Sequence, residues 1–324
     1  MLEVDIAIVG AGPTGLFAAY YAGFRGLSVA IIDALPEPGG QVTAMYPEKA
    51  IFDVAGFPVI KGRDLVANLV EQAGAFNPTY LLGIRADKLA YLDDGRPSLT
   101  LSDGEVLNCG AVLITGGLGS FSSRPLPAAD AFTGDGVRFF VKHLDDLAGH
   151  DVVIVGGGDS AFDWALALQP LAKSVTMVHR RDKFRAHAST VARVRELPIE
   201  IIVNAEVTEI LGEGRVDGCV VTPKATGEPR HLPATTVVAA LGFTADLGPL
   251  AEWGLALDRR HIKVDSTTAT NLSRVYAAGD ISEYAGKVRL IAVGFGEAAT
   301  AVNNAAVAID PTAHLFPGHS SDAG

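Results

Sequence analysis

Residues Val4–Asp33 read VDIAIVGAGPTGLFAAYYAGFRGLSVAIID. An apolar run is followed by a glycine-rich turn, a second apolar run of about a helix's length and a third apolar run that ends in an acid. This order predicts a strand, a turn, a helix and a second strand, as in a dinucleotide-binding βαβ unit. In such a unit Gly10 makes the tight turn, Gly12 lets the backbone approach a pyrophosphate, and Gly15 lets helix and strand pack closely.

Asp33 stands at the end of the third apolar run, where an acid accepts hydrogen bonds from a ribose diol. The pyrophosphate would lie at the start of the helix, because unpaired N–H groups and the helix dipole both favour an anion there. One glycine fingerprint is weak evidence, and a turn whose glycines serve only packing is the alternative.

A second copy of the pattern strengthens the dinucleotide interpretation. Residues 150–181 read HDVVIVGGGDSAFDWALALQPLAKSVTMVHRR and align with the first copy at a constant offset of 146 residues, without a gap. The paired positions are Asp5 and Asp151, Gly10 and Gly156, Gly12 and Gly158, Gly15 and Ala161, Val29 and Val175, and Asp33 and His179. We therefore expect two dinucleotide sites, the second formed by Gly156, Gly158, Asp159 and Ser160.

The position that differs between the copies predicts which nucleotide each one binds. Asp33 would repel a 2′-phosphate, whereas the second copy has His179, Arg180 and Arg181 there, followed by Arg185. The planar fork of donors on arginine suits phosphate, so the second copy should prefer NADP(H), which leaves FAD for the first. A solvated basic surface patch is the alternative.

Composition narrows the class of protein. The chain has 324 residues, 48% hydrophobic and 19% charged, which is typical of a soluble globular protein with two domains. A net charge of −11 argues against nucleic acid and against an anionic membrane surface as partners. Cys109 and Cys219 are too far apart for a CxxC pair or a metal cluster, so we expect two core thiols and no metal site. The uncharged run 6–24 is broken by glycines and a proline and has no basic segment before it, so we expect no membrane span and a cytoplasmic location.

The rest of the chain predicts one domain inserted into another. A stretch rich in Gly, Ser and Pro begins at about residue 118, and a long helix is expected near the C-terminus. The expected fold class is α/β with two Rossmann-like domains: an FAD domain of residues 1–117 and 244–324, and an NADP domain of residues 118–243. The inner segment has a net charge of −2 and the outer segments −9. Residues 43–65 are expected to be an ordered loop whose aromatic side chains cover part of a site.

Six short motifs now carry a resemblance to a known family. The chain resembles the low-molecular-weight thioredoxin reductases over essentially its whole length. The matching motifs are GAGPTG at 10–15, GGQ at 39–41, TGG at 115–117, GGGDSA at 156–161, HRRDKFRA at 179–186 and AAGD at 277–280. Those enzymes carry a CxxC pair just before the second fingerprint, but residues 137–150 contain no cysteine. Without a dithiol the chain cannot reduce thioredoxin by that route.

The pattern instead resembles the thioredoxin-reductase-type ferredoxin/flavodoxin–NADP reductases, through residues 41–58, 121–127, 156–165 and the C-terminal HSS at 319–321. This resemblance implies an FAD enzyme that moves electrons between NADPH and ferredoxin or flavodoxin, with hydride passing between nicotinamide and flavin. It also implies a homodimer in which the C-terminal tail of one subunit reaches the flavin of the other.

The resemblance also implies particular site residues. Tyr46 would stack on one face of the flavin, and His319, with Ser320 nearby, would lie at the opposite face. The remaining implied contacts are Thr14, Asp33, Gln41, Ala86, Phe121 and Asp280. From the residues alone, Asp280 could instead be a helix cap and Tyr46 part of a loop core.

Two other functions remain compatible with the sequence. The chain could reduce a different acceptor, such as a quinone or a low-molecular-weight disulfide, or it could be a non-catalytic regulator that binds FAD and NADPH. Ferredoxins are generally acidic, so a net charge of −11 would repel them unless Lys and Arg cluster locally, most plausibly on the inner domain.

Overall fold

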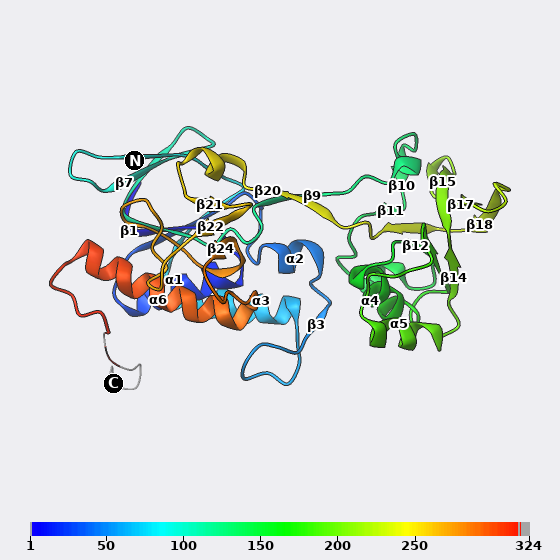
Figure 1. Cartoon of the computed structure of the whole chain (residues 1–324), viewed down its shortest axis with the longest axis horizontal. Coiled ribbons are helices and arrows are strands. Elements are labelled where there is room, and N and C mark those ends of the chain that lie inside the picture. The colour runs from blue at the N-terminus through cyan, green and yellow to red at the C-terminus, as the bar shows by residue number, and fades with distance from the viewer. Residues whose placement is uncertain (1, 317, 319–324) are drawn as a thin grey trace. The chain divides into compact units, whose positions relative to one another are not determined.

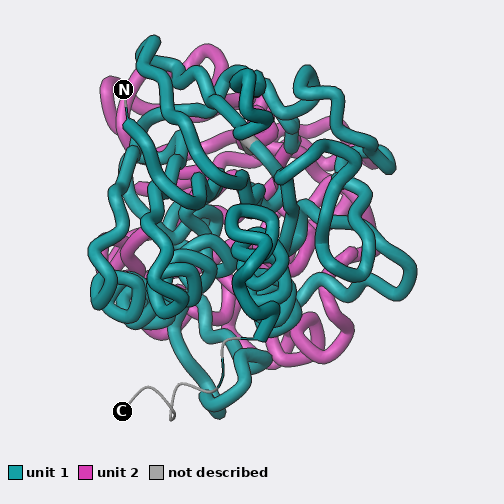
Figure 2. The backbone as a smooth tube through the Cα atoms, turned by 90° about the vertical axis from the view of Figure 1, so that its left-hand side faces the viewer, with its two compact units in different colours: residues 1–121, 245–324 teal, residues 122–244 magenta. Residues whose placement is uncertain are grey.

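The chain forms two compact units. The computed structural model describes residues 2–316 and 318, and of Ser120 and Phe121 it describes only the backbone. One unit comprises residues 1–121 and 245–324, and the other comprises residues 122–244 (Figure 2). The chain passes between them along β9 (Ser120–Ser123) and β20 (Phe243–Asp246), which pair with each other. We call the discontinuous unit unit 1 and the continuous one unit 2.

Unit 1 is built on a parallel sheet. Its strands are β1 (Leu2–Val9), β2 (Val29–Asp33), β5 (Thr79–Leu82), β6 (Ala86–Tyr91), β7 (Pro97–Leu101), β8 (Val106–Ile114) and β23 (Val275–Ala277). The order is β5-β2-β1-β8-β7-β6, with β23 pairing in parallel with the C-terminal half of β8. The β6–β7 hairpin is antiparallel, whereas β5, β2, β1, β8 and β23 run parallel.

Both faces of this sheet are covered, which explains why its parallel strands β2, β8 and β23 are apolar at most positions. The main helices are α1 (Pro13–Phe24), α3 (Gly62–Gly74) and α6 (Ile291–Ile309), and α1 packs between the other two on one face (Figure 1). The other face is covered by the β6–β7 hairpin, by the short helix η3 (Gly248–Glu252), and by a small sheet of β21 (Leu257–Asp258), β22 (His261–Lys263) and β24 (Ser282–Glu283).

Unit 2 repeats the same scheme with fewer helices. Its parallel sheet has the order β11-β19-β12-β13-β14, and a separate antiparallel sheet has the order β15-β17-β18. The parallel strands are β11 (Val137–Arg138), β12 (Asp151–Val155), β13 (Ser174–His179), β14 (Glu200–Val203) and β19 (Thr236–Ala239). The helices are α4 (Asp159–Leu168) and α5 (Ala188–Arg195), with the short helices η1 (Pro127–Ala129) and η2 (Leu144–Leu147). The antiparallel strands are β15 (Ala205–Leu211), β17 (Gly218–Pro223) and β18 (Arg230–Pro233), and β10 (Gly134–Asp135) pairs with β16 (Gly214–Arg215).

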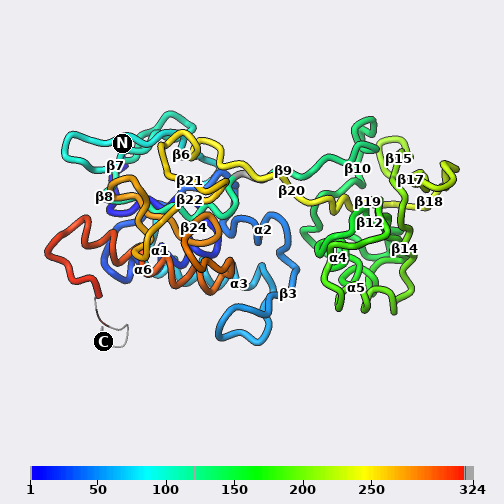
Figure 3. Tube along the Cα trace, viewed as in Figure 1, coloured from blue at the N-terminus to red at the C-terminus, as the bar shows by residue number. Residues whose placement is uncertain are grey.

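Each unit makes the same contacts within itself, at positions related by the 146-residue offset found in the sequence. The chain can be followed through both parallel sheets by colour in Figure 3. Ile6 on β1 is level with Val29 on β2, and Val152 on β12 is level with Val175 on β13. The matching hydrogen bonds are Gly10 N–H to Ile32 O at 2.8 Å and Gly156 N–H to Val178 O at 3.0 Å, and Ser28 Oγ to Asp5 and Ser174 Oγ to Asp151, each at 2.6 Å. The α/β fold with two Rossmann-like domains is thereby confirmed.

The stretch after β2, expected to be an ordered loop, contains regular elements as well. It contains the helix α2 (Gln41–Met45) and the strands β3 (Ala50–Ile51) and β4 (Ile60–Lys61). The aromatic side chains of this stretch do not all cover a site, because Phe52 and Phe57 are 73% and 40% exposed. Their neighbours Val54 and Ile60 fill the core in their place.

The two cysteines expected to lie in the core do so. Cys109 and Cys219 are buried, and Trp164 on α4 is buried as well. Burial raises the pKa of both thiols, to about 12 for Cys109 and about 11 for Cys219. Through residues 2–316 and 318, no helix is both long enough and apolar enough to cross a bilayer.

Candidate functional site

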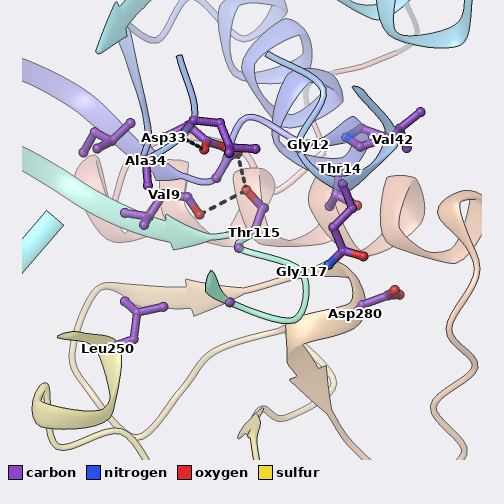
Figure 4. Close-up of a pocket in the computed structure, with 18 of the residues that line it drawn as sticks. Val9, Gly12, Thr14, Asp33, Ala34, Val42, Thr115, Gly117, Leu250 and Asp280 are labelled. Carbon is purple, nitrogen blue, oxygen red and sulfur yellow. Dashed lines mark hydrogen bonds between the residues drawn. The ribbon is translucent and has the colours of Figure 1, made fainter. Parts of the chain in front are cut away.

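A cavity of about 390 Å³ lies in unit 1 at the C-terminal ends of the parallel strands. Ligands bind at this edge of open α/β sheets because the loops there carry free backbone groups and helix N-termini. Eight residues proposed from the sequence line it: Gly10, Gly12, Thr14, Asp33, Gln41, Tyr46, Ala86 and Asp280. In Figure 4, Asp33 and Asp280 lie on opposite sides of the cavity, with Thr115 and Gly117 between them.

At one end of the cavity, Asp33 is held by two backbone donors. Ala11 N–H donates to one carboxylate oxygen at 2.7 Å and Leu35 N–H donates to the other at 2.8 Å. Burial raises the pKa of Asp33 above its ordinary value, and the two backbone bonds oppose that rise. Each oxygen retains a lone pair, so the carboxylate can accept a hydrogen bond from a hydroxyl group in the cavity.

The glycines between β1 and α1 have two different roles. A Cβ on Gly15 would lie 1.9 Å from Gly10 O, and one on Gly10 would lie 2.6 Å from Thr115 O, so both positions exclude a side chain. Gly10 also has a φ of +119°, which glycine adopts readily. A Cβ on Gly12 would meet nothing within 4 Å, so Gly12 leaves open space toward the cavity. Thr115 holds the turn by donating to Gly10 O at 2.8 Å.

At the other end of the cavity, Tyr46 and Asp280 lie close together. Burial raises the pKa of both groups, and the Asp280 charge adds to the rise at Tyr46. Leu290 and Ile291 complete this wall. Because α6 begins at Ile291, the unpaired N–H groups of its first turn lie at this end of the cavity.

The second fingerprint forms the turn between β12 and α4 in unit 2. Gly156 resembles Gly10 in its surroundings, since a Cβ there would lie 2.4 Å from Ala240 O. Gly158 precedes α4 and, like Gly12, has open space where a Cβ would be. Asp159 and Ser160 are the first two residues of α4.

The basic segment after β13 is folded back onto this turn. Arg185 N–H donates to Gly157 O at 2.7 Å, and His187 N–H donates to the Asp159 carboxylate at 2.9 Å. The His179 ring packs against Gly157, where a Cβ would lie 2.4 Å from the ring. Burial lowers the pKa of His179, and Arg180 contributes to this decrease.

Arginines carry most of the positive charge of this segment. Arg180, Arg181 and Arg185 are all exposed, as is Lys183. With His179 neutral near pH 7, these three guanidinium groups and the Lys183 ammonium supply the positive charge beside the turn. They follow His179, which occupies the position that Asp33 has in unit 1.

Some proposed site residues lie outside the described part of the structure, and two residues at the site were not predicted from the sequence. His319 and Ser320 lie outside the described residues, as does the side chain of Phe121. Leu250 lines the cavity from η3, but nothing in its sequence context marks it. Glu297 is buried beside the Asp280 loop. The sequence could have indicated it, because Glu297 is the one charged residue within the 19 residues of the apolar helix α6.

Comparisons with known proteins agree with this geometry. Residues 4–306 match the family model described as pyridine nucleotide-disulphide oxidoreductase. A protein of Salinispora tropica named ferredoxin–NADP reductase is 73% identical over 322 residues, covering 99% of each chain. A ferredoxin–NADP reductase of Thermus thermophilus is 48% identical, covering 99% of this chain and 97% of its own.

Solved structures show the same fold. The crystal structure of T. acidophilum thioredoxin reductase superposes with a TM-score of 0.76 at 29% identity, covering 93% of this chain and 97% of that one. The cysteine pair expected of a thioredoxin reductase is missing here, because the sequence contains only Cys109 and Cys219. The chain belongs to the pyridine nucleotide-disulphide oxidoreductase family, together with the ferredoxin–NADP reductases that match it along nearly its whole length.

Proposed function

We propose that the chain is an FAD-dependent oxidoreductase that transfers electrons between NADPH and ferredoxin or flavodoxin. Full-length relatives with identities up to 73% are named ferredoxin–NADP reductase, which supports ferredoxin as the acceptor. The observation that carries the proposal is the difference between the two glycine-turn sites, here called nucleotide cradles: Asp33 lies at the turn of unit 1, and Arg180 and Arg181 lie at the turn of unit 2.

FAD fits the cavity of unit 1. The open space at Gly12 leaves room for a pyrophosphate beside the start of α1, where the helix dipole favours an anion. Asp33 would accept hydrogen bonds from the adenosine ribose, and Asp280 would accept one from the ribitol. Tyr46 would stack on the flavin ring at the far end of the cavity. Ala86, Thr14 and Gln41 line the same cavity and would complete the contacts.

NADPH fits the turn of unit 2. Gly158 leaves space for a pyrophosphate at the start of α4, as Gly12 does at α1. Arg180, Arg181 and Arg185 would bind the 2′-phosphate through charge-assisted hydrogen bonds. We propose accordingly that unit 1 is the FAD domain and unit 2 the NADP domain.

The protein's share of the chemistry is positioning and electrostatics. When bound, FAD supplies a centre that takes up two electrons as a hydride and releases them singly. The N-terminus of α6 would stabilise negative charge at the flavin edge nearest to Ile291. The buried thiols of Cys109 and Cys219, with raised pKa values, are poorly suited to disulfide exchange.

We further propose a cytoplasmic homodimer in which His319 and Ser320 of one subunit lie against the flavin of the other. The resemblance of the 319–321 HSS to the family's tail supports this arrangement. Arg25 supports it as well, because its guanidinium donates to His314 O at 2.8 Å and to Leu315 O at 2.9 Å. The chain is thereby held on α1 a few residues before the tail.

Anaerobic reduction of the purified holoprotein tests the proposal. We expect a flavin spectrum that NADPH bleaches much faster than NADH, followed by electron transfer to ferredoxin or flavodoxin. A protein that refuses FAD would overturn the proposal. Transfer to a quinone or a low-molecular-weight disulfide but not to ferredoxin would indicate the other acceptor class. Binding of both nucleotides without any turnover would indicate a regulator.

A further inference from the structure

Glu297 is a buried carboxylate in the second turn of α6. Its side chain is 7% exposed, and both carboxylate oxygens have hydrogen-bond donors. Oε2 accepts from Gly279 N–H at 2.7 Å and from Ser282 Oγ at 3.3 Å. Oε1 accepts from Tyr284 OH at 2.6 Å and from Lys287 Nζ.

Lys287 is the matching buried cation. Its side chain is 1% exposed, and its ammonium forms an ion pair with Glu297. Taking two charges out of water is costly, and a buried pair of this kind is often no more stabilising than apolar residues of similar size. Such a pair is therefore weak evidence for a stabilising role, and its place beside the cavity fits a functional one.

The pair is connected to the wall of the cavity. Gly279, which donates to Glu297, immediately precedes Asp280 on that wall. The segment that carries Lys287 continues to Leu290 and Ile291, which also line the cavity. A shift of the pair would move both segments at this end of the cavity.

The electric field of the pair reaches the cavity wall as well. The charge of Lys287 acts to lower the pKa of Asp280, and the charge of Glu297 acts to raise it. Arg289 and His261 are the other charged or titratable groups that act on Asp280, and both lower its pKa. Burial, the largest effect, acts with Glu297 to raise the pKa and outweighs Lys287, Arg289 and His261, so the net shift is upward.

We propose that the Lys287–Glu297 pair positions the Asp280 loop and sets the reduction potential of the flavin by keeping the field at that end of the cavity balanced. This inference rests on the proposed FAD site. The two residues are positioning residues, since they act through Asp280 and the start of α6.

The charges predict opposite effects of removing either partner. Glu297→Gln leaves the Lys287 ammonium uncompensated, and positive charge near the flavin favours electron uptake, so the potential should rise. Lys287→Met leaves a carboxylate, which should lower the potential wherever that carboxylate is ionised. The comparison is therefore made at alkaline pH, where a carboxylate without a cationic partner carries its charge.

The experiment measures the flavin midpoint potential of the holoprotein by spectroelectrochemistry. We expect a positive shift for Glu297→Gln, a negative shift for Lys287→Met, and a potential close to wild type for the double variant and for Lys287→Arg. The matched control is the exposed ion pair of Arg230 and Glu200 in unit 2, whose neutralisation should leave the potential unchanged.

A purely structural role predicts a different result. Loosening of the loop would shift the potential in the same direction in both single variants, or in neither, and either result would overturn the inference. If a single variant does not retain FAD, the double variant and Tyr284→Phe carry the test. The double variant should keep the wild-type potential, and Tyr284→Phe, which removes a neutral donor from the carboxylate, should lower it. A different potential in the double variant, or no decrease in Tyr284→Phe, would contradict the inference.

The proposed function can fail separately from this inference. A wild-type protein that binds no FAD would remove the FAD site itself. The wild-type protein could instead bind FAD and accept electrons from NADPH while the two single variants fail to shift the potential in opposite directions. That result would contradict only the role of Lys287 and Glu297.

Discussion

A single position distinguishes the two nucleotide cradles. Asp33 occupies it in unit 1, where Ala11 N–H donates to the carboxylate. His179 occupies it in unit 2, where its ring packs against Gly157. Residue 157 matches Ala11, and a side chain there would collide with the His179 ring. The two sites therefore differ at two coupled positions: Ala11 with Asp33 in unit 1, and Gly157 with His179 in unit 2. In the proposed function, Asp33 would present an anion to FAD, and the arginines after His179 would present cations to NADPH at the corresponding position of unit 2.

The arginine segment yields a prediction about nucleotide preference. Arg180→Ala combined with Arg181→Ala should raise the KM for NADPH by about 10–100-fold, because each lost charge-assisted hydrogen bond is worth about 1.5–3 kcal/mol and water replaces part of it. The KM for NADH should change little, since it has no 2′-phosphate. Steady-state kinetics with both nucleotides would measure this.

The matched control for these arginines is Arg215→Ala, an exposed arginine on β16 in the same unit. It should leave both KM values unchanged. Equal losses for NADPH and NADH in the double variant would show that the arginines do not read the 2′-phosphate.

Asp33 yields a prediction about pH. Its pKa in the fold is raised above 3.8, so its carboxylate takes up a proton at a higher pH than an exposed one. Protonation removes an acceptor for the ribose, and FAD affinity should therefore fall as the pH is lowered through this raised pKa. The stability of the FAD-free protein should respond in the opposite sense. A raised carboxyl pKa adds stability at low pH, and this is lost as the pH rises through the folded pKa.

Fluorescence titration of FAD binding between about pH 4 and pH 8 would measure the affinity, and thermal unfolding over the same range would measure the stability. Asp33→Asn should bind FAD more weakly at neutral pH and should lose this pH dependence. If the Asp33→Asn variant kept the wild-type affinity at every pH, Asp33 would not contact the ribose.

In each glycine fingerprint, the strand, turn and helix form only if the helix packs closely against the backbone of the turn. In unit 1 the turn is confined between α1 and the end of β8, with Thr115 bonded to Gly10 O. Gly15 faces that same carbonyl, and no side chain fits between them. Unit 2 has Ala161 at the position that matches Gly15, so α4 leaves room for a methyl group against its turn where α1 does not.

Two glycine variants separate packing from binding. Gly15→Ala should destabilise the protein by about 1–3 kcal/mol, because its methyl group would overlap backbone that cannot move aside cheaply. Gly12→Ala should leave the stability of the FAD-free protein within about 0.5 kcal/mol of wild type, since its methyl group would enter open space. That methyl group should nevertheless weaken FAD binding by about tenfold or more.

Thermal unfolding without FAD and titration with FAD would measure the two effects. The reverse pattern, with a stable Gly15→Ala and an unstable Gly12→Ala, would contradict the assignment of roles to these glycines.

At the scale of the whole molecule, the chain is two similar units, one inserted into the other. Each unit presents a nucleotide cradle at the C-terminal edge of its own parallel sheet, and the cavity of unit 1 lies between Asp33 and the start of α6. Of the net charge of −11, only −2 falls within residues 118–243, so the continuous part of the chain repels an acidic partner least. In a dimer, the tail beyond the Arg25 contacts would complete the flavin site.

Deletion of the residues after Phe316 tests the role of the tail. The Arg25 contacts to His314 and Leu315 would stay, so the fold and FAD binding should be retained. Exposure of one flavin face should change the flavin absorbance spectrum and the rate of electron transfer by several-fold. His319→Ala should reproduce part of this effect. Spectra, stopped-flow rates and light scattering for subunit number would measure it, and an unchanged spectrum and rate would leave the tail without a role at the flavin.

Features that depend on neighbouring residues were predictable from the sequence alone. The two fingerprints, their offset and the replacement of Asp33 by His179 follow from short-range geometry, in which a turn tight enough for a phosphate admits only certain residues. The apolar strands also follow, since a parallel sheet is covered on both faces. The long helix expected near the C-terminus is α6, whereas α2, with its single turn, was missed.

Features that depend on distant segments were decided only by the tertiary structure. Leu250 and Ala86 meet in one cavity wall because two separate segments pack over the same sheet, and no spacing in the sequence records that approach. Glu297 is isolated along α6, but folding brings Gly279, Tyr284 and Lys287 to its carboxylate. The physical reason is that a local turn restricts its own residues through backbone conformation, whereas a buried charge is specified by whichever groups folding places within hydrogen-bonding distance.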